Sequence, residues 1–96
     1  MSDLPPLTVA GRLDRVRACF ARAEIDSLVV TDLHNIRWAT GFTGSFGLLV
    51  VGEHHSTLFT DSRYAEQAPA QLAAAGADAD VVITAAIVAE GAKGLA

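Results

Sequence analysis

The spacing of hydrophobic residues in the first quarter of the chain predicts an amphipathic helix. Leu13, Val16 and Phe20 recur at steps of three and four residues, and arginines occupy several of the positions between them. Steps of this size place side chains on one face of a helix, so we expect a single helix over residues 8–24. Thr8 is a suitable N-cap because its hydroxyl can accept a hydrogen bond from a backbone N–H of the first turn.

The middle of the chain changes to the short apolar and β-branched runs that are typical of strands. Residues 27–31 are apolar enough to predict a strand covered on both faces. Asp32 follows them and is placed to cap a short helical turn over residues 33–39. Residues 47–51 and 56–60 predict an antiparallel hairpin, because the connection between them is a tight reverse turn.

The last third of the chain predicts one more helix and one more strand. The helix is expected to begin at residue 61 or 62 and to end near residue 75, where Gly76 is a natural C-terminal cap. Pro69 lies inside this pattern, and because proline lacks an N–H and crowds the preceding turn, we expect a kink or a break there. Residues 80–84 read as a fourth strand.

Helices and strands that alternate around one hairpin predict an α/β fold. The expected architecture is a mixed sheet that contains an antiparallel hairpin and is flanked by helices. With 96 residues, the chain is long enough for one small domain, spanning residues 1–96. Alanine dominates from Ala65 onward and its methyl group buries little area, so the C-terminal third should be weakly anchored. The sheet is expected to be incomplete, with an unpaired strand edge.

Charge and cysteine usage exclude several classes of protein. The net charge of −4 and the pI near 5.1 argue against a nucleic-acid partner, and Asp14 interleaves the one cluster of arginines. The single cysteine, Cys19, excludes an intramolecular disulfide, suits a reducing compartment and is expected to be a buried thiol. No apolar run reaches the ~20 residues that span a bilayer, and the N-terminus lacks the pattern of a signal peptide. We therefore expect no membrane partner and a cytoplasmic location.

The residues that usually carry chemistry do not form a catalytic or metal-binding pattern. The adjacent pair His54 and His55 lies in a turn, where successive side chains diverge, and no His-Glu-x-x-His motif is present. Ser45 lacks the glycine spacing of a nucleophile elbow. Gly41 and Gly44 precede a strand and not a helix, so they predict a tight passage into the hairpin instead of a phosphate-binding loop. We expect no catalytic residue and no bound metal in this chain.

Two segments together carry the most specific signal in the sequence. Residues 35–45 read NIRWATGFTGS, residues 60–68 read TDSRYAEQA, and the apolar hairpin lies between them. This order resembles the N-terminal domain of Xaa-Pro aminopeptidases, prolidases and creatinases. Members of that family combine a small N-terminal α/β domain with a larger "pita-bread" metallopeptidase domain. The resemblance implies that this chain is a truncated form of the first of these domains and that the catalytic domain is absent from it.

The resemblance also implies what an intact parent protein does. It would be a metal-dependent hydrolase, a Xaa-Pro aminopeptidase or dipeptidase, with two divalent ions (Mn, Co or Zn) held by carboxylates and a histidine of the catalytic domain. The N-terminal domain would contribute to oligomerisation and substrate access and would be inactive alone. Its partners would be its own catalytic domain, neighbouring subunits and proline-containing peptides.

His34, Asn35, Arg37 and Trp38 are candidate site residues because they follow the first strand, where open α/β sheets bind ligands. In several relatives the matching segment reaches the active site of a neighbouring subunit. By that resemblance Trp38 offers apolar area to a proline ring and Arg37 a partner to a peptide carboxylate. A plain packing role for Trp38 is the alternative.

Arg63 and Tyr64 are candidate interface residues, since both residue types are enriched at interfaces. The alternative is that Arg63 pairs with Asp61 and locks the corner between strand and helix. Two other functions also stay open. One is a stand-alone interaction or scaffold module that has lost its enzyme half, and the other is the N-terminal domain of a creatinase-type hydrolase.

Overall fold

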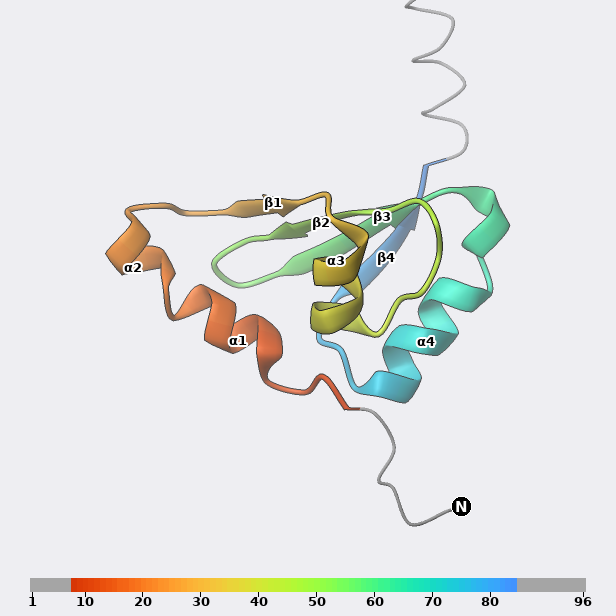
Figure 1. Ribbon diagram of the computed structural model, residues 1–96, viewed down its shortest axis with the longest axis horizontal. Helices are drawn as coiled ribbons and strands as arrows, with labels where there is room; N and C mark the ends of the chain where they lie inside the picture. Colours follow the sequence, from red (N-terminus) through yellow and green to blue (C-terminus); the bar gives the residue numbers. More distant parts are fainter. Residues whose placement is uncertain (1–7, 85–96) are drawn as a thin grey trace, which may run out of the picture.

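The computed structural model describes residues 8–84, which form one four-stranded sheet with helices packed against it (Figure 1). The elements follow one another along the chain as α1 (Arg12–Arg17), α2 (Phe20–Ala23), β1 (Leu28–Val30), α3 (Leu33–Thr40), β2 (Leu48–Val51), β3 (Ser56–Thr60), the 3₁₀ turn η1 (Ser62–Tyr64), α4 (Gln67–Ala75) and β4 (Asp80–Ile83). None of the helices in this described part is long and apolar enough to cross a membrane.

The sheet is mixed, as the sequence predicts. Its spatial order is β1-β2-β3-β4, in which β1, β2 and β3 pair antiparallel and β4 runs parallel to β3. Leu49 pairs with Leu58 in the hairpin, and Leu58 pairs with Val81 across the parallel step. The helix α4 connects the two parallel strands, which is the usual way to join such a pair. The predicted hairpin and the mixed sheet are therefore confirmed.

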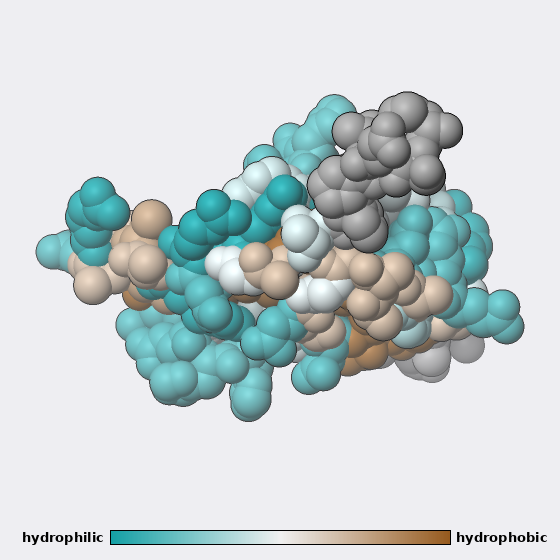
Figure 2. Space-filling model, turned by 90° about the horizontal axis from the view of Figure 1, so that it is seen from below, coloured by the Kyte–Doolittle hydropathy of each residue, from teal (hydrophilic) through white to brown (hydrophobic). Residues whose placement is uncertain are grey.

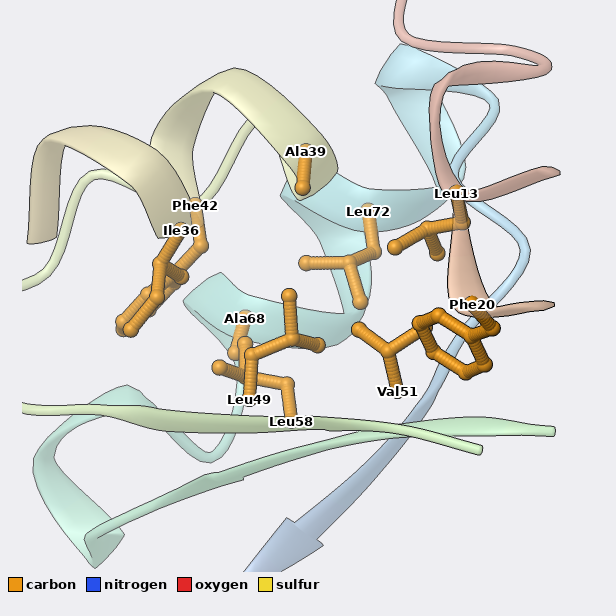
Figure 3. Packing of buried hydrophobic residues seen from close by; sticks show 10 residues of the cluster. All are labelled: Leu13, Phe20, Ile36, Ala39, Phe42, Leu49, Val51, Leu58, Ala68 and Leu72. Carbon is orange, nitrogen blue, oxygen red and sulfur yellow. The ribbon is translucent and has the colours of Figure 1, made fainter. Parts of the chain in front are cut away.

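One face of the sheet carries the core (Figure 3). Leu49, Val51 and Leu58 point to the same side because alternate residues of a strand share a face, and all three are fully buried. Every α-helix contributes to the same cluster, so the helices of the described residues share this face. The cluster consists of Leu13, Phe20, Ile36, Ala39, Phe42, Leu49, Val51, Leu58, Ala68 and Leu72.

The other face of the sheet is less well covered. Val29, which pairs with Val50, is 56% exposed, so the prediction that the first strand is covered on both faces was wrong. Val82 is also exposed on this side, because it pairs with Phe59 in the register that points away from the helices. Figure 2 shows the molecule from below, the side on which α1 and α4 lie in Figure 1. Hydrophilic residues predominate there toward α1 and α2, and hydrophobic residues cross the middle toward the alanine-rich α4.

The first helix is shorter than predicted and is divided in two. It begins after Gly11, whose φ of 82° is left-handed, so Thr8 is not its N-cap. The Thr8 hydroxyl accepts a hydrogen bond from the Ala10 N–H at 3.3 Å and donates to the Ala75 carbonyl at 3.4 Å, ahead of the helix. Between α1 and α2 the N–H of Cys19 donates to the Val16 carbonyl at 3.1 Å, a tighter step of three residues that ends the regular helix. Cys19 is exposed at this break, so its expected burial was also wrong.

The predicted helix over residues 61–75 begins later than expected. Asp61 caps the separate 3₁₀ turn η1, and α4 starts only at Gln67. Pro69 then lies in the first turn of α4, where a missing N–H breaks no hydrogen bond, so the interruption precedes the proline instead of following from it. Gly76 ends the helix with a φ of 73°, which confirms its role as the cap.

Candidate functional site

Helix α3 carries four of the six candidate residues, and its ends are well defined. The Asp32 carboxylate accepts hydrogen bonds from the backbone N–H groups of His34 (2.8 Å) and Asn35 (3.2 Å), which confirms it as the N-cap. Gly41 ends the helix with a φ of 81°. The cap and the glycine together fix the direction in which the side chains of this short helix point.

The four candidates on α3 border two different hollows. His34 lies beside Arg37 at one of them, and Asn35 lies beside Trp38 at the other. His34 and Arg37 line a depression of about 290 Å³, together with Leu33, Phe42 and the loop Thr43–Gly44–Ser45. Asn35 and Trp38 line a separate pocket. The sequence grouped these residues as one set, and the structure divides them.

The pocket beside Asn35 and Trp38 is apolar and has a volume of about 230 Å³. Trp38 is 45% exposed, so it is not a core residue. The Arg12 guanidinium lies 5.1 Å from the centre of the Trp38 ring and donates to the Trp38 carbonyl at 2.6 Å. Arg15 approaches the same ring at 6.0 Å. These two arginines hold the indole as one wall of the pocket.

Thr43 borders the depression beside His34 and Arg37, and two side chains of α4 hold it in place. Its N–H donates to Gln71 Oε1 at 3.0 Å, and its Oγ1 accepts from Gln71 Nε2 at 2.8 Å. Gln67 Nε2 also reaches Thr43 Oγ1, at 3.3 Å. The sequence analysis missed both glutamines. Their spacing of four residues on a predicted helix, which places them on one face, was the available signal.

Ser45 is held by the turn η1. Its N–H donates to the Tyr64 hydroxyl at 3.0 Å, and the two hydroxyl groups share a hydrogen bond of 2.6 Å. These bonds hold the pKa of Tyr64 below its usual value. The Tyr64 ring packs edge-to-face on Phe42, with 5.3 Å between the ring centres. A Cβ on Gly44 would overlap the Phe42 ring, so the loop requires glycine at that position. Tyr64, a predicted interface residue, thus contacts the loop that borders His34 and Arg37.

Arg63 forms a two-pronged ion pair with Asp61. Arg63 Nη2 lies 2.6 Å from Asp61 Oδ2, and Nε lies 3.0 Å from Oδ1. The guanidinium is also 5.2 Å from the Tyr64 ring centre. This arrangement matches the alternative in which the pair locks the corner between β3 and η1. The hydrogen bonds from Arg63 hold the pKa of Asp61 below its ordinary value of 3.8.

Replacing Arg63 with alanine is expected to raise the pKa of Asp61 toward 3.8. In the parent chain the stabilisation from this carboxylate is complete above its unfolded-state pKa and is lost as the pH falls through the lower folded-state value. The variant keeps the hydrogen bond from the backbone N–H of residue 63, so it should lose only part of that dependence. A carboxyl titration followed by NMR measures the shift directly. Arg22→Ala serves as the control, and an Asp61 pKa that is equal in both variants would contradict the assignment.

Metal-binding side chains do not gather in the part of the chain that the structure describes. Within residues 8–84, no three histidine, cysteine, aspartate or glutamate side chains come close enough to hold an ion. His54 is exposed in the hairpin turn, with its Nε2 4.0 Å from Glu53 Oε2. The donor set of a metal pair therefore does not fit this region.

Comparison with known proteins identifies the family. Residues 12–94 match the creatinase/prolidase N-terminal domain. The chain belongs to this family. The creatinase/prolidase match also confirms the family that the two sequence motifs suggested.

Three relatives illustrate the similarity of this creatinase/prolidase domain to peptidases. The chain is 41% identical over 61 residues to the uncharacterized peptidase YqhT of Bacillus subtilis (strain 168), a match that covers 64% of the chain and 17% of YqhT. It resembles the solved N-terminal domain of the cytoplasmic peptidase PepQ of Mycobacterium tuberculosis H37Rv at 36% identity and a TM-score of 0.68, covering 76% and 55% of the two chains. For the Xaa-Pro dipeptidase of Bacillus anthracis the identity is 29%, the TM-score 0.71 and the coverage 79% and 20%.

The creatinase/prolidase domain thus spans about a sixth of the curated peptidase that it matches and about half of the solved PepQ domain. The likeness to these solved structures confirms the predicted fold class, an α/β domain with a mixed sheet. The roles of the six candidate residues stay predictions.

Proposed function

We propose that this chain serves as the non-catalytic N-terminal domain of a cytoplasmic Xaa-Pro peptidase, where it shapes substrate access and subunit contact. The observation that supports this most strongly is the depression beside α3. There the exposed His34 and Arg37 face a loop that hydrogen bonds from α4 and η1 fix at Thr43 and Ser45. A fixed polar surface of this kind suits recognition of a substrate held mainly by another domain.

The residues of the depression offer the chemistry that one end of a peptide requires. Arg37 carries a permanent charge and several donors, which suit a carboxylate. His34 and the hydroxyl groups of Thr43 and Ser45 add further hydrogen-bonding groups. In the intact protein the two divalent ions (Mn, Co or Zn) and the catalytic residues would belong to the catalytic domain. The depression would then border the cleft of that domain or of a neighbouring subunit.

The chain alone is expected to release no product from an Xaa-Pro dipeptide or from a longer peptide with proline in second position. The physical reason is that residues 8–84 gather no set of metal donors that could activate water. The measurement is a hydrolysis assay with added manganese, compared with a sample that contains no chain. Turnover above that background would contradict a non-catalytic role.

The access role is tested in a two-domain enzyme. We would replace the matched segment of the Bacillus anthracis Xaa-Pro dipeptidase with that of this chain, and then introduce Arg37→Ala. An exposed ionic contact is worth up to about 1 kcal/mol, so KM should rise roughly two- to fivefold with little change in kcat. Arg22→Ala, on α2 and outside the depression, is the matched control. Equal KM values for the two variants would refute the access role.

A further inference from the structure

In the part of the chain that the structure describes, strand β1 has one unpaired edge. It is the terminal strand of the sheet and pairs only with β2, so within residues 8–84 no segment covers its outer edge (Figure 1). In such a strand every second residue directs its N–H and C=O outward, which makes the edge a template for another strand. The side chains at this edge are apolar and exposed, because Leu28 is 38% and Val29 56% accessible.

The apolar pocket described above lies directly beside this edge. Leu28 and Val30 of β1 form one of its walls, and Trp38 and Asn35 of α3 form another. Leu28 and Val30 pair with Val51 and Leu49, so they point to the helical side of the sheet. Since both Leu28 and Trp38 are exposed, the pocket reaches solvent between them. A strand added to β1 would direct alternate side chains to the same side and therefore into this pocket.

The size and lining of the pocket suit a side chain. Its volume of about 230 Å³ is below the range of pockets that hold drug-sized ligands, roughly 300–1,000 Å³. Asn35 is the only polar side chain in the lining. Backbone pairing for affinity and a pocket for an alternate side chain are the two components of peptide recognition by strand addition.

We propose that β1 binds an extended peptide segment as a fifth strand, with a large apolar side chain of that segment in the pocket between β1, α1 and α3. This surface is independent of the depression beside His34 and of the function proposed for it. The favoured segment has lysine or arginine at both ends, because Asp26 and Asp32 flank the strand and are exposed. Opposite charges across a strand pair are stabilising, and like charges are not.

The same charges argue against a second copy of this chain as the occupant. Two β1 strands paired antiparallel about Val29 would place Asp26 of each copy opposite Asp32 of the other. That arrangement brings four carboxylates together in two like-charged pairs, each of which destabilises the contact. A segment with basic ends forms favourable pairs at the same two positions.

The test uses the single tryptophan of the chain, Trp38, as a fluorescent reporter in the pocket wall. The probe is the blocked heptapeptide Lys-Ser-Leu-Val-Val-Thr-Lys, which copies residues 27–31 and replaces both flanking aspartates with lysine. We expect a saturable change in Trp38 fluorescence on titration. Replacing the probe's leucine with serine should weaken binding about tenfold or more, because the pocket loses a buried leucine. Absence of a saturable change with the lysine peptide would overturn the proposal.

Matched variants locate the binding site. Leu28→Ser should weaken binding of the lysine peptide about tenfold, whereas Val82→Ser should leave it unchanged, since Val82 has nearly the same exposure (37%) but lies on β4, outside the pocket. Equal affinities for folded Leu28→Ser and the unchanged chain would overturn the assignment. If Leu28→Ser fails to fold, the serine-substituted probe performs the same test on the unchanged chain.

A second peptide separates the two occupants. Asp-Ser-Leu-Val-Val-Thr-Asp is the strand's own sequence and stands for a second copy of the chain. It is expected to bind several-fold more weakly than the lysine peptide at low salt. Equal or tighter binding of this peptide, together with a dimer in sedimentation velocity, would overturn the choice of a basic-ended partner and identify self-association instead.

Discussion

Replacing Phe42 with alanine is expected to remove most of the free energy of unfolding of this small domain. Phe42 is 1% exposed, packs edge-to-face on Tyr64 and fills the space beside Gly44 and Gly47. Loss of a buried phenylalanine ring costs about 3–5 kcal/mol. A domain of this size is expected to have a free energy of unfolding of roughly 5–14 kcal/mol at ordinary values per residue, and a small core places it near the lower end.

Urea unfolding followed by circular dichroism measures this effect. Phe46→Ala is the matched control, because Phe46 is 41% exposed and its removal leaves little cavity. The control should lose only a small part of the free energy of unfolding. Similar losses for both variants would show that Phe42 does not hold the loop against the hairpin. The Phe42 variant should also release Ser45 from Tyr64, which an NMR spectrum of the remaining folded fraction would show.

Gly41→Ala is the second substitution with a large expected effect. Gly41 has a φ of 81°, and a Cβ placed on it would lie 2.7 Å from the Ala75 Cβ, so the end of α3 is in direct contact with α4. In Gly41→Ala, the left-handed backbone conformation and this overlap both destabilise the fold. Left-handed backbone costs an L-residue roughly 1–2 kcal/mol, and overpacking typically adds about 1–3 kcal/mol.

Gly11→Ala separates the two contributions. Gly11 has nearly the same φ, 82°, but nothing lies within 4 Å of a Cβ built there. The free energy of unfolding that Gly11→Ala loses should therefore reflect the backbone alone. If the two variants unfold with equal slopes in denaturant, the difference between their midpoints reports the overlap with Ala75. Combining Gly41→Ala with Ala75→Gly should recover part of that difference. Equal losses at Gly11 and Gly41 would contradict the close approach of α3 and α4.

Elements with strong local signals were predictable from the sequence. Asp32 and Gly41 bracket a short apolar pattern, and the structure places α3 between them. The hairpin followed from two apolar runs around a tight turn. The first helix was predicted too long, because the break at Cys19 and the start after Gly11 depend on how the segment packs and not on its periodicity. Exposure of Val29 likewise depends on which elements cover the sheet, and no local pattern reports that.

The candidate site was predictable only in part, for the same reason. Chain proximity suggested that the residues of α3 act as one group, whereas the helical period sends Arg37 and Trp38 to different sides. The contact between Thr43 and Gln71 joins positions 28 residues apart, so no short window of sequence contains both. The link between Ser45 and Tyr64 was hidden in the same way, although Tyr64 itself was singled out.

The way in which the loop at Thr43 and Ser45 is held has a consequence for how such a domain diversifies. Its supports, Gln71 and Tyr64, stand outside the surface that His34 and Arg37 present. Substituting Gln71 or Tyr64 should therefore change the position of the loop at Thr43 and Ser45 while leaving every side chain of the depression itself unchanged. Mutagenesis libraries that aim to alter selectivity should therefore vary α4 and η1 along with α3, because residues of these two elements determine the shape of the depression indirectly.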